Sequence, residues 1–158
     1  MKNLNFSSIS DLKKILANNK INKILVICGK ISFEKSGANK IIKDLLKKKQ
    51  TNFFYKNFAY PDISELKKII IEIKKFSPDF IIAIGGGSVL DYAKIANVLF
   101  DSENIENEII NSNYQIKKKN TKLIAIPTTA GSGAEVTTNA VIYINKMKKN
   151  SYKIAIIG

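Results

Sequence analysis

Short apolar runs alternate with longer amphipathic stretches along this chain. Apolar runs rich in Ile, Val and Phe predict buried strands at residues 23–28, 52–58, 79–84 and 122–126. Stretches whose apolar positions recur with a helical period predict helices at residues 38–49, 62–76 and 89–100. Strands that alternate with helices in this order are typical of a doubly wound α/β fold with a mostly parallel sheet, and we expect that fold here.

Helix signals and breakers mark the boundaries between these elements. Residues 29–37 follow the first strand and predict a loop. Asp62 and Glu65 form a capping-box pair, which predicts the start of the second helix. The residue before Pro78 is pushed out of the α region, so we expect that helix to end there.

The pattern changes in the last third of the chain. Residues 101–120 are polar and have no clear period, which predicts a surface connection with some helix. Residues 140–144 and 152–157 predict two further strands joined by a polar turn. The sequence stops at Gly158, directly after an apolar strand, which is typical of an interrupted domain.

Composition supports one globular domain and argues against nucleic acid as a partner. The 158 residues, 45% hydrophobic and 25% charged, are enough to build a real core. A net charge of +13 would attract phosphates. However, all 26 basic residues are Lys, so the forked guanidinium that reads guanine is missing. The lysines lie mostly on the polar faces of the predicted helices, where solvated charge is ordinary.

The residues that are missing exclude several classes of site. The sequence contains no His, which excludes Ser-His-Asp catalysis, Cys-His catalysis and His-based metal sites within these residues. Cys28 is the only cysteine, so no disulfide forms within the chain, and its apolar surroundings predict a core residue. No signal-like start and no run of about 18 apolar residues occurs, so we expect no membrane partner and a cytoplasmic location.

A glycine run follows the third predicted strand. The run consists of Gly85, Gly86, Gly87 and Ser88. It lies between a predicted strand and a predicted helix, which is the position where a Rossmann-like sheet binds a phosphate. Glycines there let the backbone approach a pyrophosphate, and the Ser88 hydroxyl adds a donor. The structural alternative is a tight turn, with Ser88 as the N-cap and Asp91 completing a capping box.

A second polar segment follows the fourth predicted strand and should reach the same edge of the sheet. Thr128, Thr129 and Ser132 supply hydroxyl groups among small residues. Such groups suit contacts to a phosphate or to the ribose and amide of a nicotinamide. Taken alone, this segment would be read as an ordinary polar loop.

Together the two segments resemble the iron-containing, or group III, alcohol dehydrogenase family, at residues 85–94 and 126–137. The resemblance extends over essentially the whole chain. It implies a two-domain enzyme, in which an α/β domain binds NAD or NADP and an all-helical domain holds a divalent metal, Fe²⁺ or Zn²⁺. In such enzymes the metal polarises the oxygen of an alcohol or aldehyde substrate while a hydride passes to or from the nicotinamide.

The resemblance also indicates what this chain contains. We expect residues 1–158 to be one NAD(P)-binding α/β domain, truncated near its C-terminal end. The metal-holding helical segment is absent, so no residue of this chain is carried over as a metal ligand or as a catalytic residue. A homodimer is an expected assembly, because members of the family often dimerise through this region.

The cofactor contacts that the resemblance implies follow the two motifs. Gly85 to Ser88 would hold the pyrophosphate, with Asp91 one turn further along the helix. The remaining members of the second motif and the strand after it would approach the ribose, phosphates or nicotinamide, at positions Thr128, Thr129, Ser132, Thr137 and Lys153.

Two departures from the family bear on the adenosine end of the cofactor. Many NAD-preferring members carry an Asp after the first strand, where this chain has Gly29 followed by Lys30. Without the carboxylate, and with the ammonium of Lys30 nearby, nothing at this position repels a 2′-phosphate, so NADP is also an admissible cofactor. Tyr60 stands where the family often has Asn, so that adenine-side contact is not carried over.

Three alternatives stay open on the sequence alone. The first is a related enzyme on the same architecture, either a dehydroquinate-synthase-like lyase or a glycerol-phosphate dehydrogenase; residues 130–135 match the alcohol dehydrogenase pattern better. The second is a non-catalytic, truncated nucleotide-binding remnant. A basic nucleic-acid binder ranks last.

Overall fold

The computed structural model describes residues 9–17, 20–111, 113–114, 121–129, 133–137, 139–144 and 152–157, with the backbone alone for residues 9 and 152–157. Its centre is a four-stranded sheet in the order β2-β1-β3-β4. The four strands are β1 (Lys23–Gly29), β2 (Gln50–Lys56), β3 (Phe80–Gly85) and β4 (Lys122–Pro127). All three neighbouring pairs are parallel, which confirms the predicted sheet.

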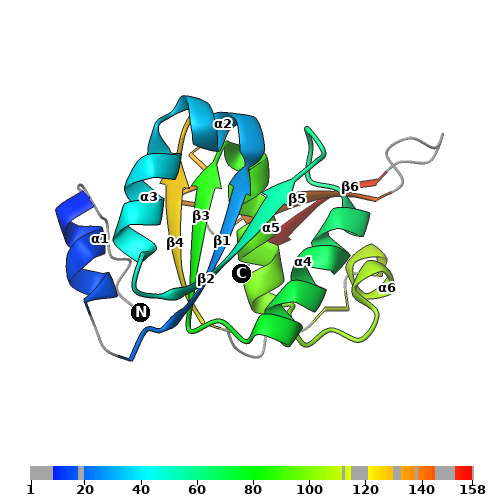
Figure 1. Cartoon of the computed structure of the whole chain (residues 1–158). Coiled ribbons are helices and arrows are strands. Elements are labelled where there is room, and N and C mark those ends of the chain that lie inside the picture. Colours follow the sequence, from blue (N-terminus) through cyan, green and yellow to red (C-terminus); the bar gives the residue numbers. More distant parts are fainter. Residues whose placement is uncertain are drawn as a thin grey trace.

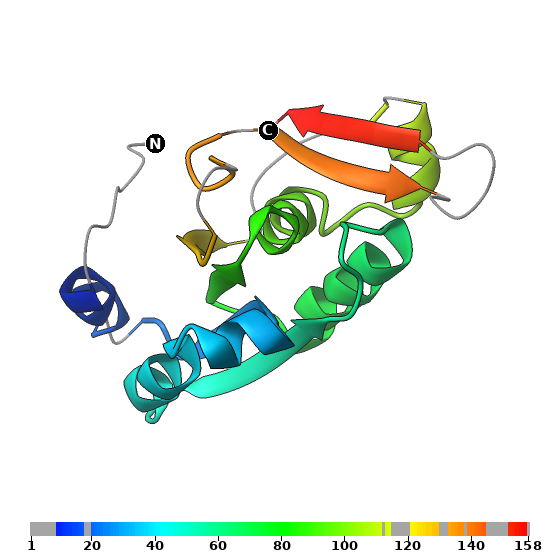
Figure 2. The same cartoon turned by 90° about the horizontal axis from the view of Figure 1, so that it is seen from above.

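Helices cover both faces of this sheet (Figure 1 and Figure 2). One face carries α1 (Ile9–Leu16), α2 (Lys30–Lys35) and α3 (Ala38–Leu46). The other face carries α4 (Ile63–Phe76), α5 (Gly87–Val98) and α6 (Ile105–Ile110). Alternate residues of β1 serve the two cores: Leu25 and Ile27 face α4 and α5, whereas Val26 and Cys28 face the first three helices. Burial on both faces explains why these strands read as continuous apolar runs.

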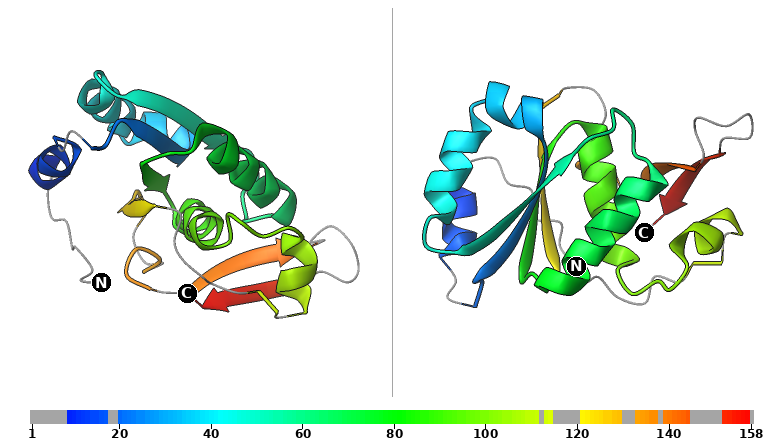
Figure 3. Two further views of the ribbon diagram at one scale, coloured as in Figure 1. Left: turned by 90° about the horizontal axis from the view of Figure 1, so that it is seen from below. Right: turned by 45° about the vertical axis from the view of Figure 1, so that its right-hand side comes forward.

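The last two strands form a separate antiparallel pair, β5 (Asn139–Ile144) and β6 (Tyr152–Ile157). This pair lies beside α4, α5 and α6, away from the parallel sheet (Figure 3). Ala140 and Ile142 of β5 are buried in the same core as α5. The amide of Tyr143 donates to the carbonyl of Pro61 at 2.7 Å, which ties the pair to the start of α4.

Several boundaries agree with the sequence-based expectations, and others move by a few residues. The third, fourth and last strands lie within about one residue of their predicted positions. The second strand begins two residues earlier than expected, at Gln50, and α3 ends at Leu46 rather than at Lys49. The helix α5 begins at Gly87, inside the glycine run, and ends at Val98.

The predicted loop at residues 29–37 is wrong, because α2 occupies most of it. Phe33 explains the helix: its side chain is fully buried, and its ring lies 6.0 Å from that of Phe53. A short segment of this kind gains its helical conformation from tertiary packing rather than from local sequence. The helix α1 was likewise not predicted, whereas α6 confirms the helix expected within residues 101–120.

The strand order creates a switch point between β1 and β3. From β1 the chain moves to β2 on one side, and it then crosses over to β3 on the other side. The connections therefore diverge above the carboxyl ends of β1 and β3, and this is the place where ligands bind in open α/β sheets. Among the described residues, no helix has both the length and the apolar character needed to cross a bilayer.

Candidate functional site

The carboxyl ends of the four strands bring the two sequence motifs together. Their arrowheads point to the top of Figure 1, where α2 begins. Gly85 at the end of β3 pairs with Pro127 at the end of β4. The carbonyl of Gly85 accepts a hydrogen bond from the amide of Thr128 at 2.9 Å. The glycine run and the threonine segment therefore meet at one edge, as the sequence predicted.

Two glycines of the run lie close to other side chains: a Cβ atom would clash at Gly85 and would be tight at Gly86. A Cβ atom on Gly85 would lie 2.9 Å from the Cβ atom of Val89. A Cβ atom on Gly86 would lie 3.2 Å from the hydroxyl of Thr129. Gly85 is therefore required for packing beneath Val89, whereas the half-buried Gly86 keeps part of its backbone accessible beside Thr129.

The N-terminus of α5 opens at this point. The N-cap residue is Gly86, and no side chain caps this 12-residue helix by a hydrogen bond. The alternative capping box, with Ser88 as N-cap and Asp91 as its partner, is therefore wrong. Amides of Gly87 and Ser88 lie in the first turn, where a helix carries a partial positive charge that favours a phosphate.

Thr128 and Thr129 differ in their surroundings. The hydroxyl oxygen of Thr128 is buried and has no hydrogen-bond partner among the described residues. Thr129 is exposed, and its hydroxyl faces Gly86. A buried polar atom without a partner carries a free-energy penalty, and a polar ligand in the crevice would remove it.

Asp91 and Thr137 take part in a contact between α5 and the segment before β5. Asp91 lies 3.5 Å from the ammonium of Lys94, and the amide of Val141 donates to its carboxylate. Burial raises the pKa of Asp91, and the Val141 amide and Lys94 oppose that rise. The Lys94 ammonium donates to the carbonyls of Ala134 at 2.9 Å and Thr137 at 3.4 Å. Asp91 and Thr137 thus have structural partners, and their contact with a cofactor stays a prediction.

The remaining predicted residues are distributed around the first strand and β6. Gly29 ends β1, and Lys30 is the exposed first residue of α2. Lys153 pairs with Tyr143 in the antiparallel ladder of β6 and β5, and its side chain lies outside the described part. Ser132 also lies outside the described residues.

The sequence indicated a turn at Tyr60 and Pro61, between β2 and α4, but not the buried groups that hold residues 57–62 in place. Glu65, almost fully buried, accepts hydrogen bonds from the amides of Asn57 at 2.5 Å and Phe58 at 3.3 Å. The predicted capping box is thus half right. Asp62 does cap α4 through the amide of Ser64, but Glu65 turns to the preceding turn instead of to Asp62.

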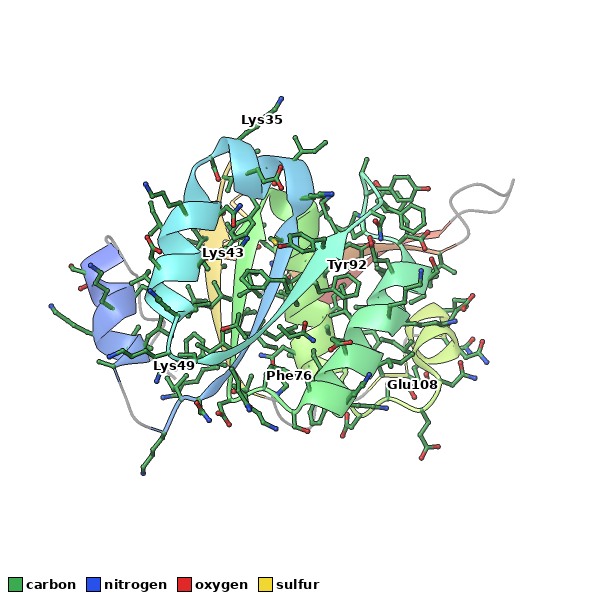
Figure 4. The ribbon with its side chains drawn as sticks, viewed as in Figure 1. Lys35, Lys43, Lys49, Phe76, Tyr92 and Glu108 are labelled. Carbon is green, nitrogen blue, oxygen red and sulfur yellow. The ribbon has the colours of Figure 1, made fainter. Side chains whose placement is uncertain are left out.

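Tyr92 of α5, labelled in Figure 4, holds the other end of this turn. Its hydroxyl accepts from the amide of Asp62 at 2.6 Å and donates to the carbonyl of Tyr60 at 3.3 Å. The ring of Tyr60 lies 6.1 Å from that of Phe58 and meets Tyr143 edge-on at 5.6 Å. The turn is therefore fixed by α4, α5 and β5 together.

Comparison with known proteins assigns this arrangement to a family. Residues 4–157 match the family described as iron-containing alcohol dehydrogenase. The chain belongs to the iron-containing alcohol dehydrogenase family. The sequence-based resemblance is thereby confirmed.

Individual members of the iron-containing alcohol dehydrogenase family are similar over much of the chain. An alcohol dehydrogenase of Thermococcus barophilus is 37% identical over 105 residues, covering 61% of this chain and 28% of that protein. The NADH-dependent butanol dehydrogenase A of Thermotoga maritima has a TM-score of 0.82 at 25% identity, covering 100% of this chain and 42% of that one. The sulfoacetaldehyde reductase of Bifidobacterium kashiwanohense, in complex with NAD⁺, has a TM-score of 0.78 at 26% identity, covering 94% and 38%.

The chain spans less than half the length of each of these three proteins. The part that it spans is the nucleotide-binding α/β region, without the helical domain of the iron-containing alcohol dehydrogenase family. The metal of that family does not fit the residues at hand. The sequence has no His, and the described residues hold no group of three or more potential metal ligands.

Proposed function

We propose that this chain is the cofactor-binding part of an NAD(P)-dependent oxidoreductase that acts on an alcohol or aldehyde. One observation carries the proposal: the Gly85 carbonyl and the Thr128 amide join the two motifs at the carboxyl edge of the sheet, beside the switch point between β1 and β3. Membership of the iron-containing alcohol dehydrogenase family supports the reaction class. The NAD⁺ complex of the sulfoacetaldehyde reductase and the NADH-dependent butanol dehydrogenase support a nicotinamide cofactor.

The described residues fit such a cofactor. The uncapped first turn of α5, at Gly87 and Ser88, would hold the pyrophosphate. The half-buried backbone of Gly86, which carries no side chain, would let the pyrophosphate approach, and the cofactor would give the buried hydroxyl of Thr128 a polar partner. Bound NAD(P) would supply the group that accepts or returns a hydride. This chain's own residues would bind and orient it within one α/β domain.

Direct binding tests the proposal. We expect saturable binding of NADH or NADPH when the folded chain is titrated and the nicotinamide fluorescence is followed. Gly86→Val should abolish most of this binding, because a branched side chain would fill the approach to α5 and press on Thr129. Ala17→Val is the matched control, since Ala17 is exposed at the end of α1.

Both variants must keep the circular dichroism of the original chain for the comparison to hold. A folded chain that binds neither NADH nor NADPH would overturn the proposal. If Gly86→Val and the control bind the cofactor equally well, the cofactor does not bind at the N-terminus of α5.

A further inference from the structure

One lysine stands at the carboxyl edge of the sheet beside the end of β1. Lys56 ends β2, and the strand register places it opposite Gly29. A Cβ atom on Gly29 would lie 3.5 Å from the Cε atom of Lys56 and 2.8 Å from the hydroxyl oxygen of Ser32. The missing side chain at Gly29 therefore leaves room for the half-buried stem of Lys56 beside the end of β1.

The position of the Lys56 ammonium is fixed by the neighbouring turn. The ammonium donates to the carbonyl of Phe58 at 2.8 Å. That carbonyl is itself held in place, because Glu65 accepts from the amides of Asn57 and Phe58. A lysine that is anchored at its tip loses little further freedom when it binds a ligand.

Lys56 lacks a paired acid within the described part of the chain. The ion pairs found there involve Lys14, Lys67 and Lys94, and none includes Lys56. An ammonium has three donors, and one of those of Lys56 is used by Phe58. Burial lowers the pKa of Lys56, although the charge of Glu65 opposes this effect. An anion placed beside it would relieve the desolvated charge.

The charge at this edge is asymmetric. The β1 end reads Gly29-Lys30 and the β2 end reads Lys56-Asn57. The carboxylate of Glu65, beside the β2 end, is engaged by the amides of Asn57 and Phe58. The β4 end, at Pro127, Thr128 and Thr129, is uncharged. In dinucleotide-binding folds an acid near the adenosine ribose hydrogen-bonds its 2′-hydroxyl and selects NAD, whereas a cation accommodates the 2′-phosphate of NADP.

We propose that Lys56 is a specificity-determining residue that pairs with the adenosine 2′-phosphate and makes this chain prefer NADP(H) over NAD(H). The inference rests on the proposed cofactor site: the pyrophosphate lies at the N-terminus of α5, and the adenosine extends over β1 toward β2. Lys30, which is exposed at the start of α2, adds a weaker attraction. Ser32 places its hydroxyl, which donates to the carbonyl of Gly29 at 3.1 Å, beside the same point of the chain.

The contribution of the 2′-phosphate to affinity can be measured by comparing two ligands that differ only in that group. Adenosine 2′,5′-bisphosphate and adenosine 5′-monophosphate differ by that group alone, as NADPH and NADH do. We expect the original chain to bind the 2′-phosphorylated member of each pair more tightly. Lys56→Met, which keeps the stem and removes the charge, should weaken NADPH and the bisphosphate about 10-fold, the loss of one charge-assisted contact.

The binding of NADH and of the monophosphate to Lys56→Met should change by less than about two-fold. Lys56→Arg should restore the preference, because it restores the charge. Lys43→Met is the charge-matched control: Lys43 is exposed on α3, across the sheet from Tyr92 of α5 (Figure 4). Lys30→Met should have a smaller effect than Lys56→Met.

The outcomes separate this inference from the proposed function. If the chain binds both cofactors but does not distinguish them, or if Lys56→Met weakens both equally, the role of Lys56 is overturned and the cofactor site stands. If the chain binds neither cofactor, the proposed function fails and the inference fails with it. A loss equal to that of Lys43→Met would show only the effect of net charge.

Discussion

The hydroxyl of Thr128 is buried at the carboxyl edge of the sheet and has no partner among the described residues. Thr128→Val keeps the shape of the side chain and removes this hydroxyl. We expect the free energy of unfolding of the free chain to stay the same or to rise slightly, because no protein hydrogen bond is lost. NAD(P)H binding should weaken by about 0.5–1.5 kcal/mol, the contribution of one neutral hydrogen bond.

Chemical denaturation and fluorescence titration check the two halves of this prediction separately. Thr121→Val provides the contrast, because the Thr121 hydroxyl donates to the carbonyl of Asp79 at the other end of the sheet. That variant should lose stability and keep cofactor affinity. A destabilised Thr128→Val that binds the cofactor normally would mean that its hydroxyl serves the fold.

Lys94 connects the helix of the first motif with the strand that follows the second motif. Its ammonium donates to the carbonyls of Ala134, Thr137 and Asn139 and pairs with Asp91. Lys94→Met leaves these acceptors without their donor, so we expect a loss of about 1–3 kcal/mol in unfolding free energy. Faster amide hydrogen exchange should concentrate in residues 133–141, and cofactor binding should weaken with it.

Hydrogen exchange followed by mass spectrometry distinguishes this local effect from general destabilisation. The amides of β1 and β3 should keep their protection, since Lys94 does not contact those strands through its ammonium. Lys75→Met is the matched control, because Lys75 is exposed in the last turn of α4. Uniformly faster exchange along the whole chain would contradict a connecting role for Lys94.

Elements with a local signal could be predicted from the sequence, and elements that depend on distant partners could not. The strand β3 and the glycine run could both be recognised in the sequence, because a buried parallel strand is continuously apolar and the glycines end that apolar run abruptly. The helix α2 was not predicted because it depends on the contact of Phe33 with Phe53, which lies on strand β2, distant in the sequence. The prediction of a capping box at α4 was half right, because the carboxylate of Glu65 accepts hydrogen bonds from the preceding turn instead of from Asp62.

The same distinction holds for the candidate site. Gly85 and Thr128 could be brought together in advance, because both follow parallel strands and must reach one edge. Lys56 could not, since its position depends on its register with Gly29, which no local pattern reveals. A lysine at the end of an otherwise aromatic strand, after Phe53, Phe54 and Tyr55, was the one signal available.

The proposed cofactor site and the absence of a metal-ligand cluster among the described residues give opposite expectations for two kinds of ligand. A ligand that binds the folded state at a hundred times its dissociation constant stabilises it by about 2.7 kcal/mol. We expect saturating NADPH to raise the melting temperature by several degrees. We expect Fe²⁺ or Zn²⁺ to leave it unchanged, because the sequence has no His and the described residues hold no ligand cluster.

Thermal melting with each ligand, and with a chelator as the control, checks this contrast. The same samples should form no NAD(P)H from a simple alcohol with either metal present. Without a metal to polarise the alcohol oxygen, cofactor binding alone does not lower the barrier to hydride transfer. Stabilisation by a metal, or steady turnover, would contradict the expectation and would require carboxylates that lie apart in the described structure to gather around the ion. NADPH stabilisation without either would assign these 158 residues to cofactor binding and the chemical step to residues that they do not include.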